Sequence, residues 1–511
     1  MSTITRQKSE NRKRLITRRL VPRTWPEQTR PMMGATGICY DIADRARGIA
    51  AGGIGAMLML ARRVGLVATI DRRLELLKAH VPYQESDHVL NIAFNILAGG
   101  RCLEDLELLR QDEGYLNALG AQRIPDPTTA GDFCRRFTER DVETLMDGLN
   151  ECRLKVWRQQ PREFFDEAVI DADGTLAPTL GECKEGADFA YEGTYGYHPL
   201  VISLANTQEP LFLVNRSGNR PSHEGAAVRF DQAIALCRGA GFRRITMRGD
   251  TDYSQTSHLD RWDTDSVGFV FGIARSQPLY ERTAELPESA WRGLRRAPKH
   301  EVKTQPRSRP ANVKDAVVHR RGFMNKRTEA ELVASFSYQP TACSKPYRIV
   351  VLRKNLTISR GEEALLDDMM FFYFITNDWK SSPAEIVLRA NARCNQENLN
   401  AQLKSGVAAL EMPVGDLVSN WAYMVMASLA WTLKAWLALL LPARGRWAAR
   451  HQAERDRVLR MEFRTFLRAF MLVPAQIVRT GRRVLYRLLG WNPWQHVLLR
   501  AIDTLSKPLR C

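Results

Sequence analysis

The sequence lacks the cysteine patterns that mark structural zinc sites and disulfide frameworks. It contains no CxxC pair and no Cys/His cluster, and the number of cysteines is odd. This pattern argues against both kinds of site and fits a reducing compartment, so we expect a cytoplasmic protein. The nine cysteines are Cys39, Cys102, Cys134, Cys152, Cys183, Cys237, Cys343, Cys394 and Cys511.

Long apolar runs are almost absent as well. No such run follows the basic N-terminal segment, so a secretory signal is not expected. One run, "LVSNWAYMVMASLAWTLKAWLALLLPA" at residues 417–443, is long enough to span a bilayer, but Asn420 and Lys434 interrupt it. We predict a buried helix of a large globular protein and no membrane partner. A membrane-associated protein is the alternative.

Acidic residues are scarce relative to basic ones. The chain has 74 Lys and Arg against 57 Asp and Glu, a formal net charge of +17. An excess of this size favours a polyanionic partner, most often nucleic acid. Residues 1–30 are rich in Lys and Arg and predict a disordered or DNA-tracking arm. Residues 442–511 are also strongly basic, and "VRTGRRVLYRLLGW" is read as an amphipathic helical stretch.

The pattern of residue types changes several times along the chain. Residues 40–160 show apolar spacing of three and four, which predicts helices. From residue 165, short runs rich in Val, Ile and Phe alternate with turn residues and one helical segment, which predicts an α/β layer. Residues 280–345 are rich in charged residues and proline. A pattern typical of strands begins again at "YRIVVLRKN". From about residue 408 to the end the pattern is helical.

Acidic side chains stand where two apolar strands end. "AVIDADGT" carries Asp171 and Asp173, two apart and therefore on one face of a strand. "ITMRGDTDY" carries Asp250 and then Asp252. Ligands of α/β sheets are usually held at the carboxyl ends of strands. Each aspartate alone is more simply read as a turn former.

The stretch "RANARCNQENLNAQLKSG" places Arg393, Glu397 and Lys404 on one stripe of a helix. A surface ion pair is the simpler interpretation of Arg393 and Glu397. With Asp173 and Asp250, however, Glu397 completes a set of three carboxylates from distant parts of the chain. Mg²⁺ and Mn²⁺ prefer such oxygen ligands, and two such ions can promote phosphodiester cleavage. Arg393 and Lys404 could then hold phosphate oxygens.

Taken in order, these motifs resemble those of insertion-sequence DDE transposases. Arg393, Glu397 and Lys404 match the Arg-Glu-Lys part of that family's signature. "IDADGT", "YGYHPL" and "MRGDTDY" resemble the group with a DxDxT first motif and an RGD-plus-aromatic second motif. "SDHVLNIAFNILAGGRCLEDLELLR" and "IPDPTTAGDFCRRF" resemble its helical region. The resemblance covers roughly residues 80–410.

The resemblance implies an α/β fold class with a ribonuclease-H-like catalytic core, interrupted by a strand-rich insertion and flanked by helical regions. We therefore expect a basic arm over residues 1–30, a helical DNA-binding region over 31–160, a first core part over 161–280, a basic strand-rich insertion over 281–346, a second core part over 347–407 and a helical C-terminal region over 408–511.

The resemblance also implies roles for single residues. Asp173, Asp250 and Glu397 are the expected catalytic and metal-binding carboxylates, and two Mg²⁺ ions (Mn²⁺ in vitro) are the expected cofactors. Asp171 competes with Asp173 for the first role, and the "DGT" step favours Asp173. Arg393 and Lys404 are expected to contact the DNA backbone near the cleaved end.

Two further residues are weaker candidates for DNA contacts. Arg248 could bind phosphate, and a structural role is as good an interpretation. Trp291 could stack on an unpaired base, although a packed tryptophan is the default.

The sequence departs from the family pattern at two positions. The signature tyrosine three residues before the arginine is replaced by Ala390, which removes one hydroxyl contact to phosphate. Asp252 stands where glycine is common and adds a negative charge beside the expected metals.

The predicted function is that of a DNA transposase in a bacterial cytoplasm, associated with the nucleoid. It would act as a homodimer on double-stranded DNA, at the terminal inverted repeats of its element and at target DNA. A metal-dependent nuclease that does not join strands is one alternative. A catalytically inactive DNA-binding derivative is another.

Overall fold

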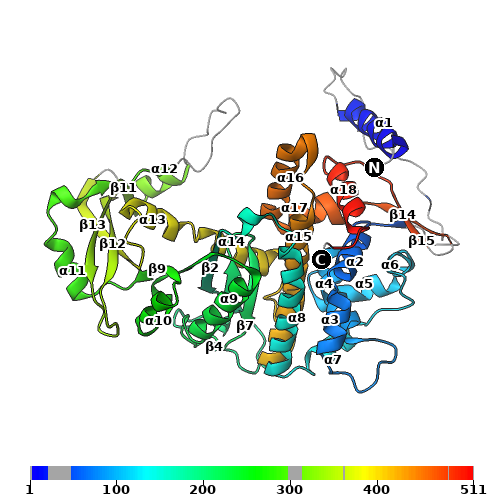
Figure 1. Ribbon diagram of the computed structural model, residues 1–511, viewed down its shortest axis with the longest axis horizontal. Coiled ribbons are helices and arrows are strands. Elements are labelled where there is room, and N and C mark those ends of the chain that lie inside the picture. Colours follow the sequence, from blue (N-terminus) through cyan, green and yellow to red (C-terminus); the bar gives the residue numbers. More distant parts are fainter. Residues whose placement is uncertain are drawn as a thin grey trace.

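The structure is a computed structural model of the chain and describes residues 3–20, 39, 48–296, 313–360, 363–480 and 483–509. A large mixed sheet occupies one part of the molecule (Figure 1). Helices from both ends of the chain pack together in the other part, so residues far apart in sequence share one helical layer.

The sheet has nine strands in the order β10-β11-β12-β13-β9-β8-β2-β6-β7. Two small three-stranded sheets accompany it. One has the order β3 (Ala177–Pro178), β5 (Tyr195–Tyr197) and β4 (Asp188–Phe189), and the other has the order β1-β14-β15. The strands of the large sheet are β2 (Glu167–Gly174), β6 (Leu200–Leu204), β7 (Glu209–Val214), β8 (Arg244–Gly249), β9 (Gly268–Ile273), β10 (Arg292–Gly293), β11 (Met324–Tyr338), β12 (Tyr347–Arg360) and β13 (Glu363–Thr376).

Five strands form the part of the sheet that carries the acidic motifs. β7, β6 and β2 are antiparallel neighbours, while β8 runs parallel to β2 and β9 runs parallel to β8. The helix α9 (Ala226–Ala240) connects β7 to β8, and α10 (Leu259–Thr264) connects β8 to β9. Every residue of β6 is buried, as expected of an inner strand covered on both faces. The predicted α/β layer is confirmed.

The predicted strand-rich insertion extends this same sheet. β11 pairs with β12 and β12 pairs with β13 along their lengths, and β13 pairs with β9 through the step from Tyr373↔Ile273 to Thr376↔Val270. The boundary predicted at residue 346 therefore falls between two paired strands. Composition revealed where the basic segment lies, but it carried no information on strand pairing. Two helices, α11 (Gln277–Ala284) and α12 (Val313–Arg320), lie in the same region.

Helices predicted for the N-terminal region are present. Local signals explain where they begin: Asp126 caps α7 by accepting a hydrogen bond from the Thr129 amide, and Thr138 and Asp141 form a capping box at α8. The helices are α2 (Ile54–Arg63), α3 (Leu66–Arg73), α4 (Glu85–Leu97), α5 (Leu106–Gln111), α6 (Glu113–Leu119), α7 (Pro127–Cys134) and α8 (Glu139–Trp157).

The long apolar run forms α15 (Leu417–Leu440), which lies in the protein interior. In the described part of the chain it is the one helix long and apolar enough to cross a membrane, but its apolar window is fully buried. It packs against α4, α8 and β7 and against α16 (Ala448–Arg460). The prediction of a buried helix is confirmed, and the two helical regions share this helix as their core.

The C-terminal region is not helical throughout. After α16, α17 (Phe463–Phe466) and a π-helical turn, the chain forms β14 (Ala475–Thr480) and β15 (Arg483–Leu488) before α18 (Gln495–Leu505). β14 pairs with β15 and with β1 (Gly48–Ile49). The predicted amphipathic helix is wrong here, because burial in β14 alternates with the period of two that marks a strand.

The basic arm predicted to be disordered contains a helix, α1 (Thr3–Leu20). Arg12 Nη1 of this helix donates a hydrogen bond to the Leu488 carbonyl at 2.7 Å, so α1 contacts β15. Residues 21–30 of the predicted arm lie outside the described residues.

A buried carboxylate joins the sheet to the helical layer. Glu209, the first residue of β7, has no exposed surface. It accepts hydrogen bonds from Arg153 Nε at 3.0 Å and Trp157 Nε1 at 3.0 Å, both in α8, and from Trp436 Nε1 in α15 at 2.8 Å. Arg153 is also buried and donates to the Pro210 carbonyl at 2.7 Å. One ionised side chain therefore fixes β7, α8 and α15 relative to one another.

Replacing Arg153 by methionine tests this connection. The substitution leaves the Glu209 charge buried without its cation, so we expect a loss of about 3–5 kcal/mol in the free energy of unfolding, measured by urea denaturation. Arg72→Ala, which removes an exposed partner of Glu151, is the control and is expected to cost about 1 kcal/mol or less. Equal losses in the two variants would contradict this role for Glu209.

Candidate active site

Two acidic residues meet where neighbouring parallel strands end. β2 and β8 pair in register from Glu167↔Arg244 to Asp171↔Arg248. Asp173 lies two residues beyond this last pair in β2, and Asp250 follows directly after β8. Parallel strands end at the same edge of a sheet, so the pairing brings these two aspartates together, as the sequence predicted.

An arginine from a third segment lies between the two aspartates. The helix α13 (Pro383–Asn391) is followed by α14 (Cys394–Ala401), and Arg393 is the N-cap residue of α14. Arg393 Nη1 lies 3.5 Å from Asp173 Oδ1 and 3.8 Å from Asp250 Oδ2. One guanidinium group therefore bridges both strand ends and ties α14 to them.

Polar side chains that the sequence analysis missed hold α14 on the sheet. Asn400 Nδ2 donates a hydrogen bond to Asp173 Oδ2 at 3.0 Å. Gln396 is buried and accepts a hydrogen bond from the Ser203 hydroxyl in β6. Asn400 comes seven residues after Arg393, on the same helical stripe, so its spacing was a signal for a residue that faces the acids.

Burial and mutual repulsion disfavour the negative charge on these aspartates. The pKa of Asp173 is raised to about 6, first by burial and then by the charges of Asp250 and Glu397, while Arg393 opposes the shift. Burial also raises the pKa of Asp250, again against Arg393. When both carboxylates are ionised, a cation between them stabilises their negative charge, and Arg393 supplies that positive charge.

Glu397 lies close enough to influence Asp173 but does not share a ligand cluster with it. Its side chain is exposed. Among the described residues, no three Asp, Glu, His or Cys side chains are placed so that they could hold one metal ion. The structure thus brings Asp173, Asp250 and Arg393 together and leaves the Glu397 carboxylate facing solvent beside them.

Lys404 follows α14 in a π-helical turn, Gln402–Gly406, so the α-helical stripe predicted to run from Arg393 to Lys404 is interrupted. Burial lowers the pKa of Lys404, and the charges of Asp173 and Glu192 oppose this shift. Lys404 therefore lies near the aspartates, as expected, although not by the regular helical spacing.

Asp171 and Arg248 have a structural role in this fold, which argues against the predicted metal and DNA contacts. Arg248 Nε and Nη2 lie 2.7 Å from Asp171 Oδ1 and Oδ2, in a pair that is almost fully buried. Arg248 Nη1 also donates to the Arg389 carbonyl of α13 at 2.9 Å. Both carboxylate oxygens and three guanidinium nitrogens are thus occupied inside the protein.

Trp291 is also buried, with 7% of its surface exposed. The Arg353 guanidinium lies over its ring, 4.3 Å from the centroid. This packing leaves little of the ring for an unpaired base and argues against the predicted stacking role.

Ala390, which stands where the family signature has tyrosine, lies in α13 and packs against a small apolar cluster that includes Ile386 and Val387. Its methyl group offers no hydrogen bond to a phosphate.

Comparison with known proteins supports the predicted resemblance. The model of one protein family, transposase DDE domain group 1, matches residues 49–509. No match was found among curated proteins.

Among solved structures, the cryo-EM structure of a piggyBac transposase synaptic complex with hairpin DNA resembles the chain. The two are 11% identical, the alignment covers 84% of this chain and 82% of that one, and the TM-score is 0.35. A TM-score of this size does not establish a shared fold.

The role of Asp171 can be separated from that of a metal ligand by its effect on stability. Asp171→Asn leaves the buried Arg248 cation without a counter-charge, so we expect a loss of about 3–5 kcal/mol in the free energy of unfolding. Asp231→Asn is the matched control, because Asp231 forms a bidentate pair with a much more exposed arginine, Arg261. A wild-type melting curve for Asp171→Asn, measured in EDTA, would show that the buried pair is not needed.

The raised pKa of Asp173 predicts a specific pH dependence. The pKa of an aspartate in the unfolded chain is about 3.9, and the pKa of Asp173 in the folded protein is about 6. Protonation of Asp173 therefore stabilises the folded protein fully below about pH 4, and this contribution is lost as the pH rises through about 6. In EDTA, Asp173→Asn is therefore expected to gain stability over wild type as pH rises from 4 to 7, by up to about 3 kcal/mol. Urea denaturation at each pH measures this difference.

Asp132→Asn, at an exposed position, is the control for the pH series. If the difference between Asp173→Asn and wild type stays constant from pH 4 to pH 7, the environment inferred for Asp173 is wrong.

Proposed function

We propose that this chain, which belongs to the transposase DDE domain group 1 family, is an insertion-sequence transposase that cuts the DNA ends of its element and joins the freed 3′ hydroxyl to target DNA. Both reactions are in-line displacements at phosphorus, so one site can serve both. Family membership supports transposase function, and the arrangement of side chains at the strand ends supports the chemistry.

The single observation that carries the proposal is the bridge from Asp173 through Arg393 to Asp250. Two partly buried carboxylates with raised pKa values face one cationic group that comes from the segment containing Glu397. A surface ion pair between Arg393 and Glu397 alone was the simpler interpretation of the third motif. The contacts of Arg393 with the two strand ends favour a common site instead.

The order of the strands supports a ribonuclease-H-like core. In such a core three antiparallel strands are followed by two parallel ones, and acidic residues stand on the first and fourth. Here β2, β6 and β7 are the antiparallel strands and β8 and β9 the parallel ones. Asp173 stands near the end of the first and Asp250 directly after the fourth.

The donor set fits hard divalent cations. Asp173 and Asp250 offer carboxylate oxygens to a position where a guanidinium group now supplies positive charge, and such oxygens suit Mg²⁺ and Mn²⁺. We propose Asp173, Asp250 and Glu397 as the residues that hold two such ions, with Glu397 approaching from the solvent side. When bound, the ions activate a water or hydroxyl group and stabilise charge on the phosphodiester oxygens.

Other residues position these carboxylates and the DNA. Asn400 fixes the rotamer of Asp173 through its amide. We propose that Arg393 would bind a phosphate oxygen when divalent cations are held by the carboxylates, because a guanidinium group is a good partner for phosphate. Lys404 provides a second positive charge beside Asp173. With Ala390 in place of tyrosine, these two cations provide the phosphate contacts.

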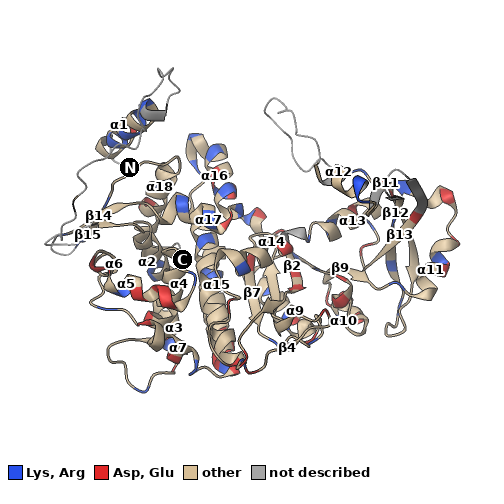
Figure 2. Ribbon diagram, turned by 180° about the vertical axis from the view of Figure 1, so that it is seen from behind, with Lys and Arg blue, Asp and Glu red and all other residues tan. Residues whose placement is uncertain are grey.

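DNA binding outside the site is proposed to depend on charge and on the N-terminal helices. Lys and Arg recur along α1 and α16 (Figure 2), which suits salt-dependent contacts with phosphates. Recognition of the terminal repeats is assigned to the helical region 31–160, and two ends brought together imply a homodimer on DNA. A bacterial cytoplasmic, nucleoid-associated location fits these partners.

The three carboxylates are tested by nicking of a duplex that carries the element's terminal sequence, with Mn²⁺. We expect Asp173→Asn, Asp250→Asn and Glu397→Gln each to lower the nicking rate by at least about a thousandfold, because each removes a proposed ligand. Glu411→Gln, at an exposed acidic position, is the control and should nick like wild type. Each variant is first checked for DNA binding and for its melting temperature.

A strand-transfer assay with pre-cleaved ends then separates a transposase from a nuclease that only cuts. Joining of labelled ends to target DNA by wild type, lost in all three variants, is the expected result. Nicking without any joining would favour the metal-dependent nuclease. DNA binding without either reaction would favour an inactive derivative. Nicking by Glu397→Gln at the wild-type rate would remove the proposed third ligand.

A further inference from the structure

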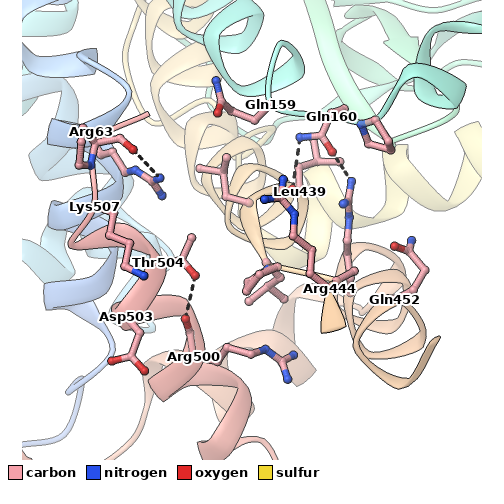
Figure 3. A pocket seen from close by; sticks show the side chains of 17 residues that line it. Arg63, Gln159, Gln160, Leu439, Arg444, Gln452, Arg500, Asp503, Thr504 and Lys507 are labelled. Carbon is pink, nitrogen blue, oxygen red and sulfur yellow. Dashed lines mark hydrogen bonds between the residues drawn. The ribbon is translucent and has the colours of Figure 1, made fainter. Parts of the chain in front are cut away.

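A second concentration of basic side chains lines a pocket away from the strand ends. It lies where the C-terminal ends of α2, α8, α15 and α18 meet α16, and its volume is about 530 Å³ (Figure 3). We refer to it as the basic pocket. Its charged lining consists of Arg63, Arg444, Arg455, Arg500 and Lys507, with Asp503 as the single acidic residue. None of these residues belongs to the candidate active site.

In the part of the chain that the structure describes, most of these cations have no acidic partner within 4.0 Å. Arg500 Nη2 pairs with Glu454 at 2.7 Å. Within the described ranges, no carboxylate lies within 4.0 Å of a charged nitrogen of Arg63, Arg455 or Lys507. The positive charge of the basic pocket is therefore largely uncompensated by the parts of the protein that are described.

Among the described residues, several hydrogen-bond donors in the pocket also lack acceptors. Arg63 Nη2 donates to the Pro508 carbonyl at 3.4 Å, but its Nε and Nη1 are buried without a partner. Arg500 Nε is in the same state. Arg455 donates to the side chain of Gln160, which also donates to the Leu439 carbonyl at 3.2 Å. Unpaired buried donors are costly, so the guanidinium groups of Arg63 and Arg500 are incompletely satisfied by the described protein.

Burial disfavours the charged form of these arginines. Loss of hydration lowers the pKa of both Arg63 and Arg455. A guanidinium group deprived of water is stabilised by an anion that accepts two or more hydrogen bonds, and phosphate has the geometry and charge for this.

Part of the pocket lining is apolar. Leu439, Leu440 and Leu441, at the end of α15, form it together with Pro161 and Pro442. A pocket of this volume, lined by both cationic and apolar side chains, suits a small amphiphilic anion better than an inorganic ion alone. A nucleotide unit, with a phosphate and a flat base, has both features.

We propose that the basic pocket binds one nucleotide unit, with the phosphate on Arg63, Arg455 and Lys507 and the base against the three leucines at the end of α15. The unit can come from a strand of bound DNA or from a free nucleotide, which share this chemistry. The inference rests on the pocket and not on the carboxylate site. The competing explanation is that these cations only stabilise the carbonyl ends of the surrounding helices.

Isothermal titration calorimetry in EDTA with inorganic pyrophosphate and with dAMP tests the proposal without any metal-dependent step. We expect both to bind wild type, and the double variant Arg63→Gln/Arg455→Gln to bind each about tenfold or more weakly. Lys507→Gln changes an exposed residue and keeps the fold, so it provides a second test. Arg446→Gln removes a neighbouring exposed charge outside the pocket and is the matched control.

The source of the nucleotide follows from fluorescence anisotropy with a labelled DNA duplex. Displacement of the duplex by pyrophosphate, with a salt slope lowered by about 1 for each charge removed from the pocket, identifies the DNA backbone. Unchanged duplex binding by pocket variants that no longer bind dAMP identifies a free nucleotide. Both results support the pocket.

Two results would overturn the proposal. The first is that wild type binds neither pyrophosphate nor dAMP. The second is that Arg446→Gln loses as much binding affinity as pocket variants whose melting temperature equals that of wild type. Asp173→Asn should bind pyrophosphate like wild type. The pocket proposal can therefore hold if the catalytic proposal fails, and the catalytic proposal can hold if the pocket proposal fails.

Discussion

The buried pair of Asp171 and Arg248 is the interaction on which the candidate active site depends. It joins β2 to β8 at the last register step before their acidic ends, and through the Arg389 carbonyl it also holds α13. Because these three segments are fixed there, Asp173 and Asp250 emerge side by side and Arg393 reaches both. A bidentate guanidinium–carboxylate pair is suited to this task, since it constrains direction as well as distance.

The α/β sheet and the meeting of Asp173 with Asp250 at its edge could be predicted from the sequence because their signals are local. Short apolar strands that end in acids indicate an α/β sheet with a site at its edge, and the Arg393–Glu397 spacing indicates a helix that faces it. The partnership of Asp171 with Arg248 could not be predicted in the same way. It depends on the register between β2 and β8, and spacing alone does not show whether an aspartate points at solvent or at an arginine.

Other differences between the predictions and the structure have the same cause, namely contacts between residues that are far apart in the sequence. Trp291 was a candidate for stacking on a base because its neighbours in sequence are basic. In the structure Arg353, about sixty residues later, covers its ring. The strands β14 and β15 were mistaken for a helix because pairing with β1, from the other end of the chain, was not visible. Asn400 was on the predicted stripe and was overlooked because an amide is a less obvious site residue than a carboxylate.

The helical layer gives the sheet a rigid support. Glu209 binds α8 and α15 to β7, and α15 is apolar enough for a membrane because it is surrounded on all sides by protein. This layer also carries the basic pocket, built from the ends of helices that only the tertiary fold brings together. The basic pocket and the carboxylate site lie in different parts of the molecule.

The central claim, that Asp173, Asp250 and Glu397 share divalent ions, is tested most directly by iron-mediated cleavage of the protein. Fe²⁺ bound in place of Mg²⁺ generates hydroxyl radicals with ascorbate and peroxide, and mass spectrometry locates the backbone cuts. The account predicts cuts near residues 173, 250 and 397 that excess Mg²⁺ suppresses and that Asp173→Asn abolishes. Cuts near the first two positions with none near Glu397 would contradict it.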